Sequence, residues 1–464
     1  MYIANKNILP IIPLAWAFLI SPPVQAAASK TVHEYKLTNG MKLIIKEDHR
    51  APVVVSQIWY KVGSANEHSG ITGISHVLEH MMFKGTRQVP AGEFSRIISI
   101  NGGRENAFTG QDYTAYFQQL SSDRLPISLR LEADRMRGLV LPDDEFEKEL
   151  NVVMEERRLR TEDDPQAKLY EQFNAAAYVN SPYHNPIIGW MDDLKNLKIN
   201  DLKAWYQHWY APNNATLVIV GDVDPDQTHT LVKRYFGRIN PIQGAPLKPR
   251  NETIQQGLRR ITVKAPAELP YLILGYKTPV LRTATDKTDV YALEMLASIL
   301  DGGNSARMAR ELIRGQQIAA SASASYDLLA GHDSLLLLDA TPAPGTSVAD
   351  LEKQLRTQIQ KLQQQPVTDE ELARVKAQVV AENVYQRDSV FYQAMQIGIL
   401  ETVGLSWRLL DHYVENIRAV TAAQVQQVAQ KYLNDDQLTI AVLEPLPIEQ
   451  KAQQMTGPRG NHGH

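Results

Sequence analysis

The chain has 464 residues, of which 44% are hydrophobic, and this length predicts two domains of about 200 residues each. Its formal net charge of -4 provides no basic patch for nucleic acid and argues against a nucleic-acid-binding protein. The sequence contains no cysteine, which excludes a disulfide framework and a thiolate metal site.

The N-terminus has the pattern of an export signal. Lys6 precedes an apolar run at residues 8–20, and two prolines and the small-residue sequence Val-Gln-Ala end the segment at residue 26. Such a run is typical of a secretory signal, and it is too short and too interrupted by proline for a stable membrane span. We expect residues 1–26 to be a signal peptide and the protein to be periplasmic, since export without disulfides suits that compartment.

Residues 76–80 read His-Val-Leu-Glu-His. Positions three and four apart lie on one face of a helix, so His76, Glu79 and His80 converge. A hydrolytic zinc site needs three protein ligands, an open position for water and a carboxylate that accepts a proton. The pattern supplies two ligands and the base, and Gly85 is placed to end the helix. The alternative is a solvated pair of surface histidines.

A strand is expected next. After the glycine pair at 102–103, residues 106–117 alternate, with Tyr113, Ala115 and Phe117 on one face. The alternation alone does not show a functional role, because an ordinary core strand would have the same pattern.

The third ligand has to come from elsewhere, and the helix expected at residues 141–160 offers carboxylates. Glu155 and Glu156 are adjacent, so only one of them can face the metal. Glu149 lies about two helical turns before Glu156 and on the same face of the helix. We therefore expect Glu156 to be the ligand and Glu149 to orient a ligating imidazole. For Glu149, a solvated acidic face is the alternative.

The chain also has an internal duplication. A helical segment ending at 209–214 leads into an apolar strand at 215–220, and 431–436 lead into 437–442 in the same way. The second half has no His-x-x-Glu-His, and its clearest feature is a turn at 300–307 with Asn304 or Ser305 as a helix cap. The expected divisions are a zinc-binding domain at 31–240, a polar linker at 241–257, a homologous non-catalytic domain at 258–449 and a disordered tail at 450–464.

Together these residues resemble the inverted zinc peptidases of the pitrilysin and insulinase type, whose signature is His-x-x-Glu-His on a helix. The chain looks like a half-length bacterial member related to the mitochondrial processing peptidase. The resemblance implies an α+β fold of two homologous domains, each an antiparallel β-sheet backed by α-helices. It rests on residues 39–43, 63–67, 73–86, 106–109, 112, 114, 116 and 149–156.

The resemblance also implies an activity and a site. It implies a zinc metalloendopeptidase with one Zn²⁺ per chain, bound by His76, His80 and Glu156, and with Glu79 as the general base. The substrates would be peptides or unfolded segments. Such a peptidase adds its substrate to a sheet edge as an extra strand. The substrate-contacting residues would be Asn106, Ala107 and Phe108.

The sequence departs from this family in the second half. Ile313 and Ala320 occupy the positions where the family has a substrate-binding Arg and Tyr, and neither can donate a hydrogen bond from its side chain. Arg314 and Tyr326 lie nearby but out of register. We hypothesise a heterodimer with a homologous, zinc-free subunit that supplies both groups; a homodimer is the alternative.

Two other classes of protein stay open from the sequence. The chain could be a peptide-binding or assembly protein that retains a peptidase fold but has little activity of its own. The zinc could also be purely structural, although structural sites usually close the fourth position with another Cys or His.

Overall fold

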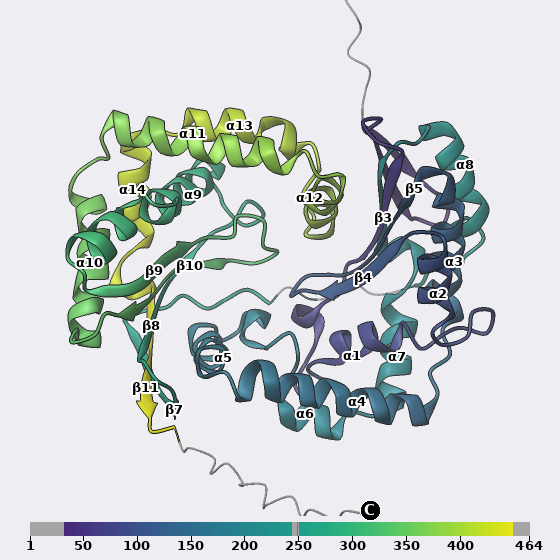
Figure 1. The fold of residues 1–464 in the computed structure, drawn as a ribbon, viewed down its shortest axis with the longest axis horizontal. Coiled ribbons are helices and arrows are strands. Elements are labelled where there is room, and N and C mark those ends of the chain that lie inside the picture. Colours follow the sequence, from purple (N-terminus) through teal and green to yellow (C-terminus); the bar gives the residue numbers. More distant parts are fainter. Residues whose placement is uncertain (1–31, 244–247, 249, 449–464) are drawn as a thin grey trace, which may run out of the picture. The chain divides into compact units, whose positions relative to one another are not determined.

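The computed structural model describes residues 32–243, 248 and 250–448, so the predicted signal peptide at 1–26 and the tail at 450–464 lie outside the described residues. Two sheets are each backed by helices (Figure 1). The first sheet has the order β1 (Val32–Lys36), β2 (Lys42–Glu47), β6 (Ala215–Gly221), β3 (Val53–Tyr60), β5 (Thr114–Ser121), β4 (Arg104–Thr109). The second has the order β7 (Arg259–Pro266), β11 (Leu438–Leu446), β8 (Tyr271–Thr278), β10 (Ser334–Pro342), β9 (Ala319–Ser325).

Helices lie in the longer connections between the strands of both halves. The first half has α1 (Ile74–Met81), α2 (Glu93–Ile100), α3 (Leu125–Gly138), α4 (Asp143–Arg157), the π-helix η3 (Arg158–Glu162), α5 (Pro165–Ala177), α6 (Met191–Asn196), α7 (Ile199–Trp209) and α8 (Pro225–Phe236). The second half has α9 (Lys287–Asp301), the π-helix η6 (Met308–Gly315), α10 (Val348–Gln364), α11 (Asp369–Gln386), α12 (Val390–Thr402), α13 (Leu409–Ala419) and α14 (Ala422–Tyr432). Among the residues that the structure describes, no helix is both long enough and apolar enough to cross a membrane.

The two sheets repeat one strand order, which confirms the two homologous units predicted from the sequence. From β2 onward the first sheet runs β2-β6-β3-β5-β4, and the second runs β7-β11-β8-β10-β9. Each position is therefore filled by the strand with the same place in its half of the chain. Strands β6 and β11, which follow α7 and α14, are equivalent, as the repeated helix-to-strand endings indicated.

Each sheet is antiparallel except at one pair. β2 pairs with β6 in parallel, and β7 pairs with β11 in parallel. In both halves the last strand follows a long helical connection and inserts between two earlier strands: β6 lies between β2 and β3, and β11 lies between β7 and β8. A parallel neighbour requires such a long crossover, whereas the other pairs do not.

The central strands of the first sheet are buried on both faces. On one face, α3 contacts β3 and α8 contacts β2. The hydrophobic core on this face includes Leu43, Ile58 and Leu217. On the other face, Trp59 and Val218 pack with Ala394 and other residues of α12. All seven residues of β6 are buried, which explains why it is a continuous apolar run and not an alternating one.

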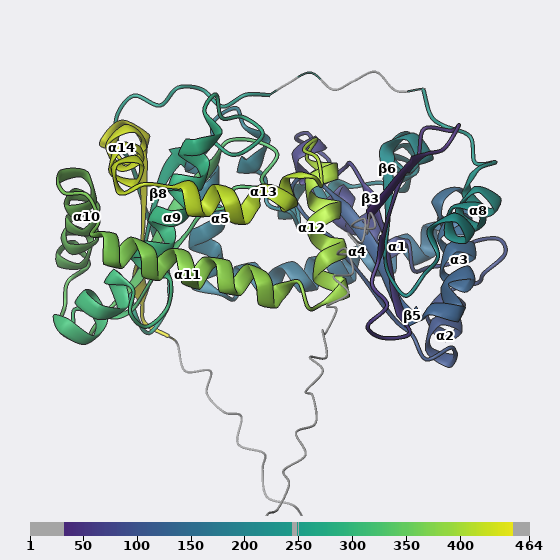
Figure 2. The ribbon, with the colours of Figure 1, turned by 90° about the horizontal axis from the view of Figure 1, so that it is seen from above.

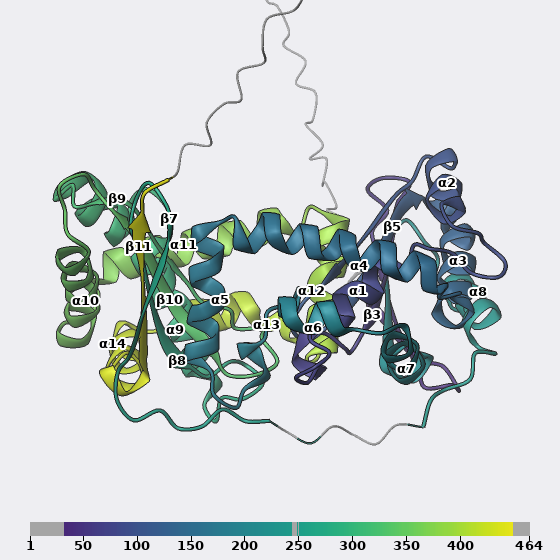
Figure 3. The same ribbon diagram turned by 90° about the horizontal axis from the view of Figure 1, so that it is seen from below.

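The helix that completes each sheet comes from the other half of the chain. Helix α12 contacts β3 and β6 of the first sheet, whereas α5 contacts β7 and β11 of the second (Figures 2 and 3). Leu169 and Phe173 of α5 share a buried cluster with Ile273 and Leu443. The predicted domain limits therefore stay a prediction, because one face of each sheet is covered by a helix of the other half.

The predicted linker is attached to both halves where it is described. The guanidinium of Arg250 donates to the carbonyl of Ala65 over 2.5 Å. The carboxylate of Glu252 accepts from the ammonium of Lys277 at 2.6 Å and from the backbone N–H groups of residues 179–181. These contacts explain how a stretch without apolar periodicity is held in place.

Local expectations were wrong at three places. Residues 106–117 form a hairpin and not one strand, because the N–H of Gly110 donates to the carbonyl of Tyr113 over 2.8 Å and closes a turn between β4 and β5. Helix α1 ends at Met81, four residues before Gly85, which instead forms an isolated bridge with Pro90. Asn304 and Ser305 do not cap the next helix, since η6 begins after Arg307 without a side-chain cap.

Gly398 of α12 packs directly against Trp59 of the first sheet. A Cβ at this position would come 2.0 Å from the indole Cε2 of Trp59. Alanine favours a helix over glycine by about 1 kcal/mol, but we expect Gly398→Ala to lower the free energy of unfolding by about 1–3 kcal/mol through overpacking. Denaturant unfolding measures this, and adding Trp59→Phe should recover part of the loss. A more stable Gly398→Ala variant would contradict the close packing.

Candidate metal centre and active-site cleft

Helix α1 presents the three predicted residues on its outer face. His76, Glu79 and His80 are half-buried, which leaves them accessible to a ligand and still partly shielded from water. The opposite face is anchored in the first core. Its fully buried side chains are Ile74, Val77, Leu78 and Met81.

The start of α1 is held by backbone geometry and one buried carboxylate. Gly73 has φ +87°, and a Cβ there would come 2.5 Å from the carbonyl oxygen of Ile188. The carboxylate of Glu67 accepts the N–H groups of Gly73 and Ser75 at 2.7 and 2.9 Å. These N–H groups lack partners within the helix, so Glu67 fixes where α1 begins.

Helix α4 brings Glu156 to the two histidines, as its place on the same helix face as Glu149 predicts. Its Oε2 lies 3.4 Å from Nε2 of His80 and 3.9 Å from Nε2 of His76. Ligand atoms about 2.1 Å from one tetrahedral ion stand about 3.4 Å apart. Within the described ranges these three residues are the one group of His, Asp or Glu side chains whose ligand atoms all lie within 4.8 Å of one another. Two imidazoles and a carboxylate fit zinc.

Glu149 lies behind His80, where the sequence places a supporting carboxylate. The Nδ1 of His80 is 2.9 Å from Oε1 of Glu149, and the ammonium of Lys84 is 2.5 Å from Oε2. Burial opposes ionisation of Glu149, but the hydrogen bonds from Lys84 and His80 outweigh it and hold its pKa below the usual value. An Nδ1–H that donates to Glu149 leaves the Nε2 lone pair of His80 facing Glu156.

His76 is kept neutral by its surroundings. Burial, followed by the charges of His80 and Arg160, lowers the pKa of His76 to about 3. Neutral imidazole is the form that binds a metal, so no proton has to leave this side chain at neutral pH. Its Nδ1 is buried and has no hydrogen-bond partner among the residues described here, unlike the Nδ1 of His80.

The carboxylate of Glu79 is held by a residue that the sequence analysis missed. The hydroxyl of Thr109, the last residue of β4, donates to Oε2 of Glu79 over 2.5 Å. Burial raises the pKa of Glu79 above its usual value, and the hydrogen bond from Thr109 opposes the shift. Thr109 belongs to the resembling segment 106–109, which was the available signal.

Arg160 is a second residue that the sequence analysis left without a role in the site. It is 74% exposed, and its guanidinium lies 2.6 Å from Oε1 of Glu156. The ion pair engages the oxygen of Glu156 that faces away from the histidines. It therefore restricts how the carboxylate can turn.

Strand β4 is the edge of the first sheet beside this site. Its place at the end of the strand order leaves one side of its backbone unpaired within the sheet. Asn106 is exposed, Ala107 packs against the first core, and the Phe108 ring lies edge-on to Trp59 at 5.3 Å. An edge with this exposure can accept an extended peptide as a further strand.

The metal-ligand residues and the edge strand face one cleft of about 1460 Å³. Its lining includes the three predicted ligands, Glu79 and the predicted substrate residues Asn106, Ala107 and Phe108. The remaining walls come from α4, η3, α5 and the loop before α6, and the second half contributes Tyr271. The space is large enough for several residues of a peptide.

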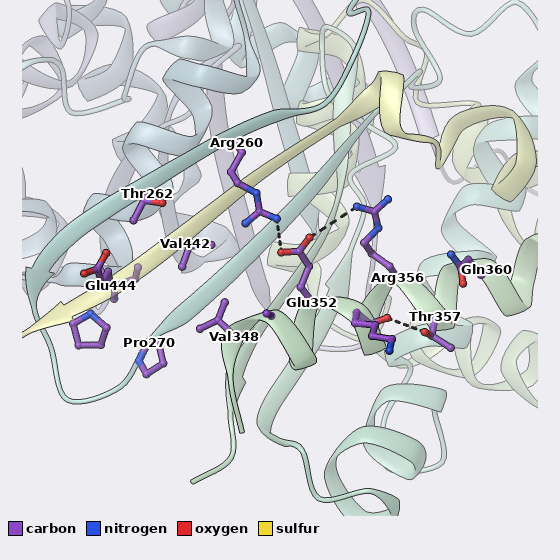
Figure 4. Close-up of a pocket in the computed structure, with 14 residues that line it drawn as sticks. Arg260, Thr262, Pro270, Val348, Glu352, Arg356, Thr357, Gln360, Val442 and Glu444 are labelled. Atoms are coloured by element: carbon purple, nitrogen blue, oxygen red, sulfur yellow. Dashed lines mark hydrogen bonds and ion pairs between the residues drawn. The ribbon is translucent and has the colours of Figure 1, made fainter. Parts of the chain in front are cut away.

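A second hollow, of about 830 Å³, lies between α10 and strands β7 and β11 (Figure 4). Two of its arginines are paired: Arg260 donates to Glu352 at 2.5 Å, and Arg356 donates to Asp435 at 2.6 Å. None of its lining residues lines the cleft. The hollow therefore takes no part in the predicted site.

The second-half positions that depart from the family lie away from the cleft. Ile313 packs against the second core, and Ala320 is exposed on β9. Arg314 and Tyr326 each donate to a backbone carbonyl of the second half. Within the described residues, none of the four lines the cleft. None of these four residues therefore takes the place of the Arg and Tyr in the described cleft.

The loop at residues 181–186 contains Tyr183 and His184, and Tyr183 makes the contacts to other parts of the chain. The Nδ1 of His184 contacts the carbonyl of Ser181 at 2.7 Å, within its own turn. The hydroxyl of Tyr183 donates to Asp112 over 2.5 Å and accepts the N–H of Gly331 at 2.9 Å. It therefore joins the β4–β5 turn to a loop of the second half.

Removing the carboxylate behind His80 should weaken metal binding without removing a ligand. We expect Glu149→Gln to lower zinc affinity by about 10- to 100-fold, because the imidazole loses the charge that orients it. Competition with a chromophoric chelator measures the affinity. Glu147→Gln, at an exposed position on the same helix, is the matched control and should leave the affinity unchanged. Equal affinities for both variants would exclude a role for Glu149 in the site.

Comparison with known proteins places this chain in a family. The insulinase model (peptidase family M16) matches residues 42–190, and the peptidase M16 inactive-domain model matches residues 196–379. The chain is 33% identical to the zinc protease PqqE of Helicobacter pylori over 424 residues, which are 88% of this chain and 92% of that protein.

Solved structures give the same result. The crystal structure of a protease from Helicobacter pylori superposes with a TM-score of 0.85 at 32% identity and covers 89% of this chain and 99% of that one. The periplasmic protease PqqL from Escherichia coli shares the fold, with a TM-score of 0.75 at 18% identity, and the match covers 89% of this chain but 48% of PqqL. The chain therefore belongs to peptidase family M16, the insulinase family, whose curated relatives are named zinc proteases.

Proposed function

We propose that the chain is a zinc-dependent metalloendopeptidase that hydrolyses peptides or unfolded polypeptide segments and holds one Zn²⁺. The observation that carries the proposal is the meeting of His76, His80 and Glu156 in one cleft with Glu79. When bound, zinc supplies a Lewis acid that polarises a carbonyl and makes water more acidic. Within the described residues no fourth His, Asp or Glu joins the group, which favours a catalytic over a structural site.

Glu79 is the proposed general base. Its carboxylate is positioned by Thr109 and accepts a proton from the water that attacks the scissile carbonyl. As the carbon–nitrogen bond breaks, the same carboxyl returns the proton to the departing amine.

Strand β4 is the proposed substrate grip. A peptide added along its free edge would exchange backbone hydrogen bonds with residues 106–108 and bring a carbonyl towards the histidines of α1, which contacts β4. Backbone hydrogen bonds select an extended conformation and not a sequence. This supports peptides and unfolded segments as substrates, as opposed to folded proteins.

We also propose that the working enzyme is a pair of homologous subunits, in which a zinc-free partner supplies the substrate-binding Arg and Tyr. Two observations support it: Ile313 and Ala320 stand at those positions, and this chain matches about half of PqqL. A homodimer is the alternative. The export pattern at residues 1–26 supports a periplasmic location, which cell fractionation tests.

Replacing the base should separate metal binding from turnover. We expect Glu79→Gln to lower kcat by at least about 10²- to 10⁴-fold, since the amide cannot accept the proton, while metal analysis still finds one zinc per chain. His80→Ala is the contrasting variant and should lose the metal. An unchanged kcat in Glu79→Gln would refute the base assignment. Bound zinc without cleavage of any peptide, with or without a partner, would favour the assembly protein.

The partner proposal predicts a weak isolated chain. We expect the purified chain alone to cleave peptides about 10- to 100-fold more slowly than the chain mixed with a homologous subunit that carries the Arg and Tyr, because the substrate lacks those hydrogen bonds. Gel filtration and a fluorogenic peptide assay measure complex formation and rate. Full activity of the isolated chain would remove the hetero-pair and leave the homodimer or monomer.

A further inference from the structure

The second half contains a cavity of about 280 Å³ that is separate from the cleft. It lies among α9, α11, α12, α13 and the loop after β9, and Figure 1 shows α11 and α13 beside α9. None of its lining residues lines the cleft. Its volume is near the lower limit of sites for small molecules, so the chemistry of its lining decides what it can hold.

The lining of this cavity carries negative charge without positive charge. Glu294, Asp327 and Glu382 line it, whereas no lysine, arginine or histidine does so among the described residues. Asp327 and Glu382 are exposed, so water can solvate both of them. Carboxylates that face one cavity without a cationic side chain attract a cation from solution.

Glu294 of α9 is buried without a full set of partners. Its Oε1 accepts a hydrogen bond from the hydroxyl of Tyr413, but its Oε2 is buried and has no hydrogen-bond partner among the described residues. Burial raises the pKa of Glu294 to about 7; the hydrogen bond from Tyr413 opposes this shift, and the charge of Asp327 adds to it. A buried carboxylate oxygen without a partner is rare in a folded protein and indicates a ligand, a water molecule or an ion.

A second unpaired acceptor and several aromatic rings complete the lining. The Oδ1 of Asn383 on α11 is also buried, and no partner for it lies in the described part of the chain. The rings of Tyr291 and Tyr413 have centroids 6.4 Å apart and planes at 62°, and tyrosine faces attract cations. Unpaired acceptors require a ligand that donates hydrogen bonds, and the rings favour one with a positive charge. The tyrosines of the lining are Tyr291, Tyr326, Tyr392 and Tyr413.

We propose that this cavity binds a primary ammonium group carried on a short aliphatic chain. The ammonium donates to Oε2 of Glu294 and Oδ1 of Asn383, and the aliphatic chain packs against the leucines of the lining. A metal ion is a poorer occupant, because no described residue of the cavity belongs to a group of three metal-ligand side chains. Such a site is independent of the proposed peptidase function, since it needs neither zinc nor cleavage. The leucines are Leu281, Leu328, Leu329, Leu400, Leu409 and Leu410.

An occupied cavity would stabilise the packing of α12. Tyr392, Gln396 and Leu400 of this helix line the cavity, whereas Ala394 and Ile397 pack on the first sheet. A ligand between α9 and α12 therefore holds the helix that covers the first sheet. Since it binds the folded chain, it also raises the unfolding temperature as its concentration increases.

Three small molecules test the recognition of an ammonium group. n-Pentylamine and n-pentanol have the same carbon chain, but only the amine is charged at neutral pH. We expect titration calorimetry in phosphate buffer to give a dissociation constant of about 0.1–1 mM for the amine and a value at least about 10-fold higher for the alcohol. Tetramethylammonium, which has no N–H group, should also bind at least about 10-fold more weakly. Of the three, the amine should raise the unfolding temperature most.

A charge-removing variant tests the place of binding. Glu294→Gln keeps the size of the side chain and an acceptor for Tyr413, and a neutral amide costs less to bury than a carboxylate. We therefore expect this variant to fold and to bind pentylamine at least about 10-fold more weakly. Glu268→Gln, at an exposed position between β7 and β8 that does not line the cavity, is the matched control and should leave the affinity unchanged.

Four results would overturn the ammonium site. They are no binding of pentylamine, equal binding of pentanol, equal or tighter binding of tetramethylammonium, and unchanged binding in Glu294→Gln, which would place the amine elsewhere, such as at the metal-ligand residues. If Glu294→Gln does not fold, the comparison of amine with alcohol on the unmodified chain decides.

A lysine side chain offers the same group as a free amine, and Nα-acetyllysine amide distinguishes the two sources. Binding as tight as that of pentylamine would assign the site to a lysine of a peptide. Weaker binding would assign it to a free alkylamine.

Discussion

The packing of α1 against α4 is the contact on which the candidate site depends. Val77, Leu78 and Met81 are fully buried, so α1 cannot rotate by one residue, about 100°, without exposing them. In α4, the buried Leu150 and Val153 fix the rotation of the stripe that carries Glu149 and Glu156. The donor atoms are thus arranged by core packing and by the ion pair of Lys84 with Glu149, before any metal arrives.

The second half shapes the cleft although none of its described residues joins the metal-ligand group. One face of α5 packs on the second sheet through Leu169 and Phe173, and Tyr170 of the same helix lines the cleft. Tyr271 of β8 lines it as well. Since a cleft wall rests on the second sheet, a change in the core of the second half can alter the space in front of the histidines.

The sequence predicted those parts of the site that follow from local periodicity. His76, Glu79 and His80 belong to one helical turn, and Glu149 and Glu156 lie two turns apart on one helix, so their convergence needs no knowledge of the remote chain. The structure brings these side chains together, while their catalytic and metal-binding roles stay predictions. The repeat of the helix-to-strand endings likewise predicted two related sheets, which the common strand order confirms.

Contacts between distant segments could not be predicted in this way. The hydrogen bond from Thr109 to Glu79 depends on how the β4–β5 hairpin lies over α1, and the turn of that hairpin was itself missed. The apolar residues of α12 indicate a buried face, but nothing in their spacing says that the first sheet covers it. The π-turn at η3 also has no signal in apolar periodicity, because it changes the number of residues per turn at one point.

Helices α5 and α12 each cover the sheet of the other half of the chain, and this has a consequence for biosynthesis. Strand β3 is made early, but α12, which covers its Trp59 face, is made near the end of translation. Until then an apolar sheet surface stays open on the nascent chain, and closing it requires contacts between segments far apart in sequence, which form slowly. The Trp59 face of the first sheet therefore cannot be covered until residues 390–402 have been made, and an incomplete chain exposes an apolar surface that favours self-association.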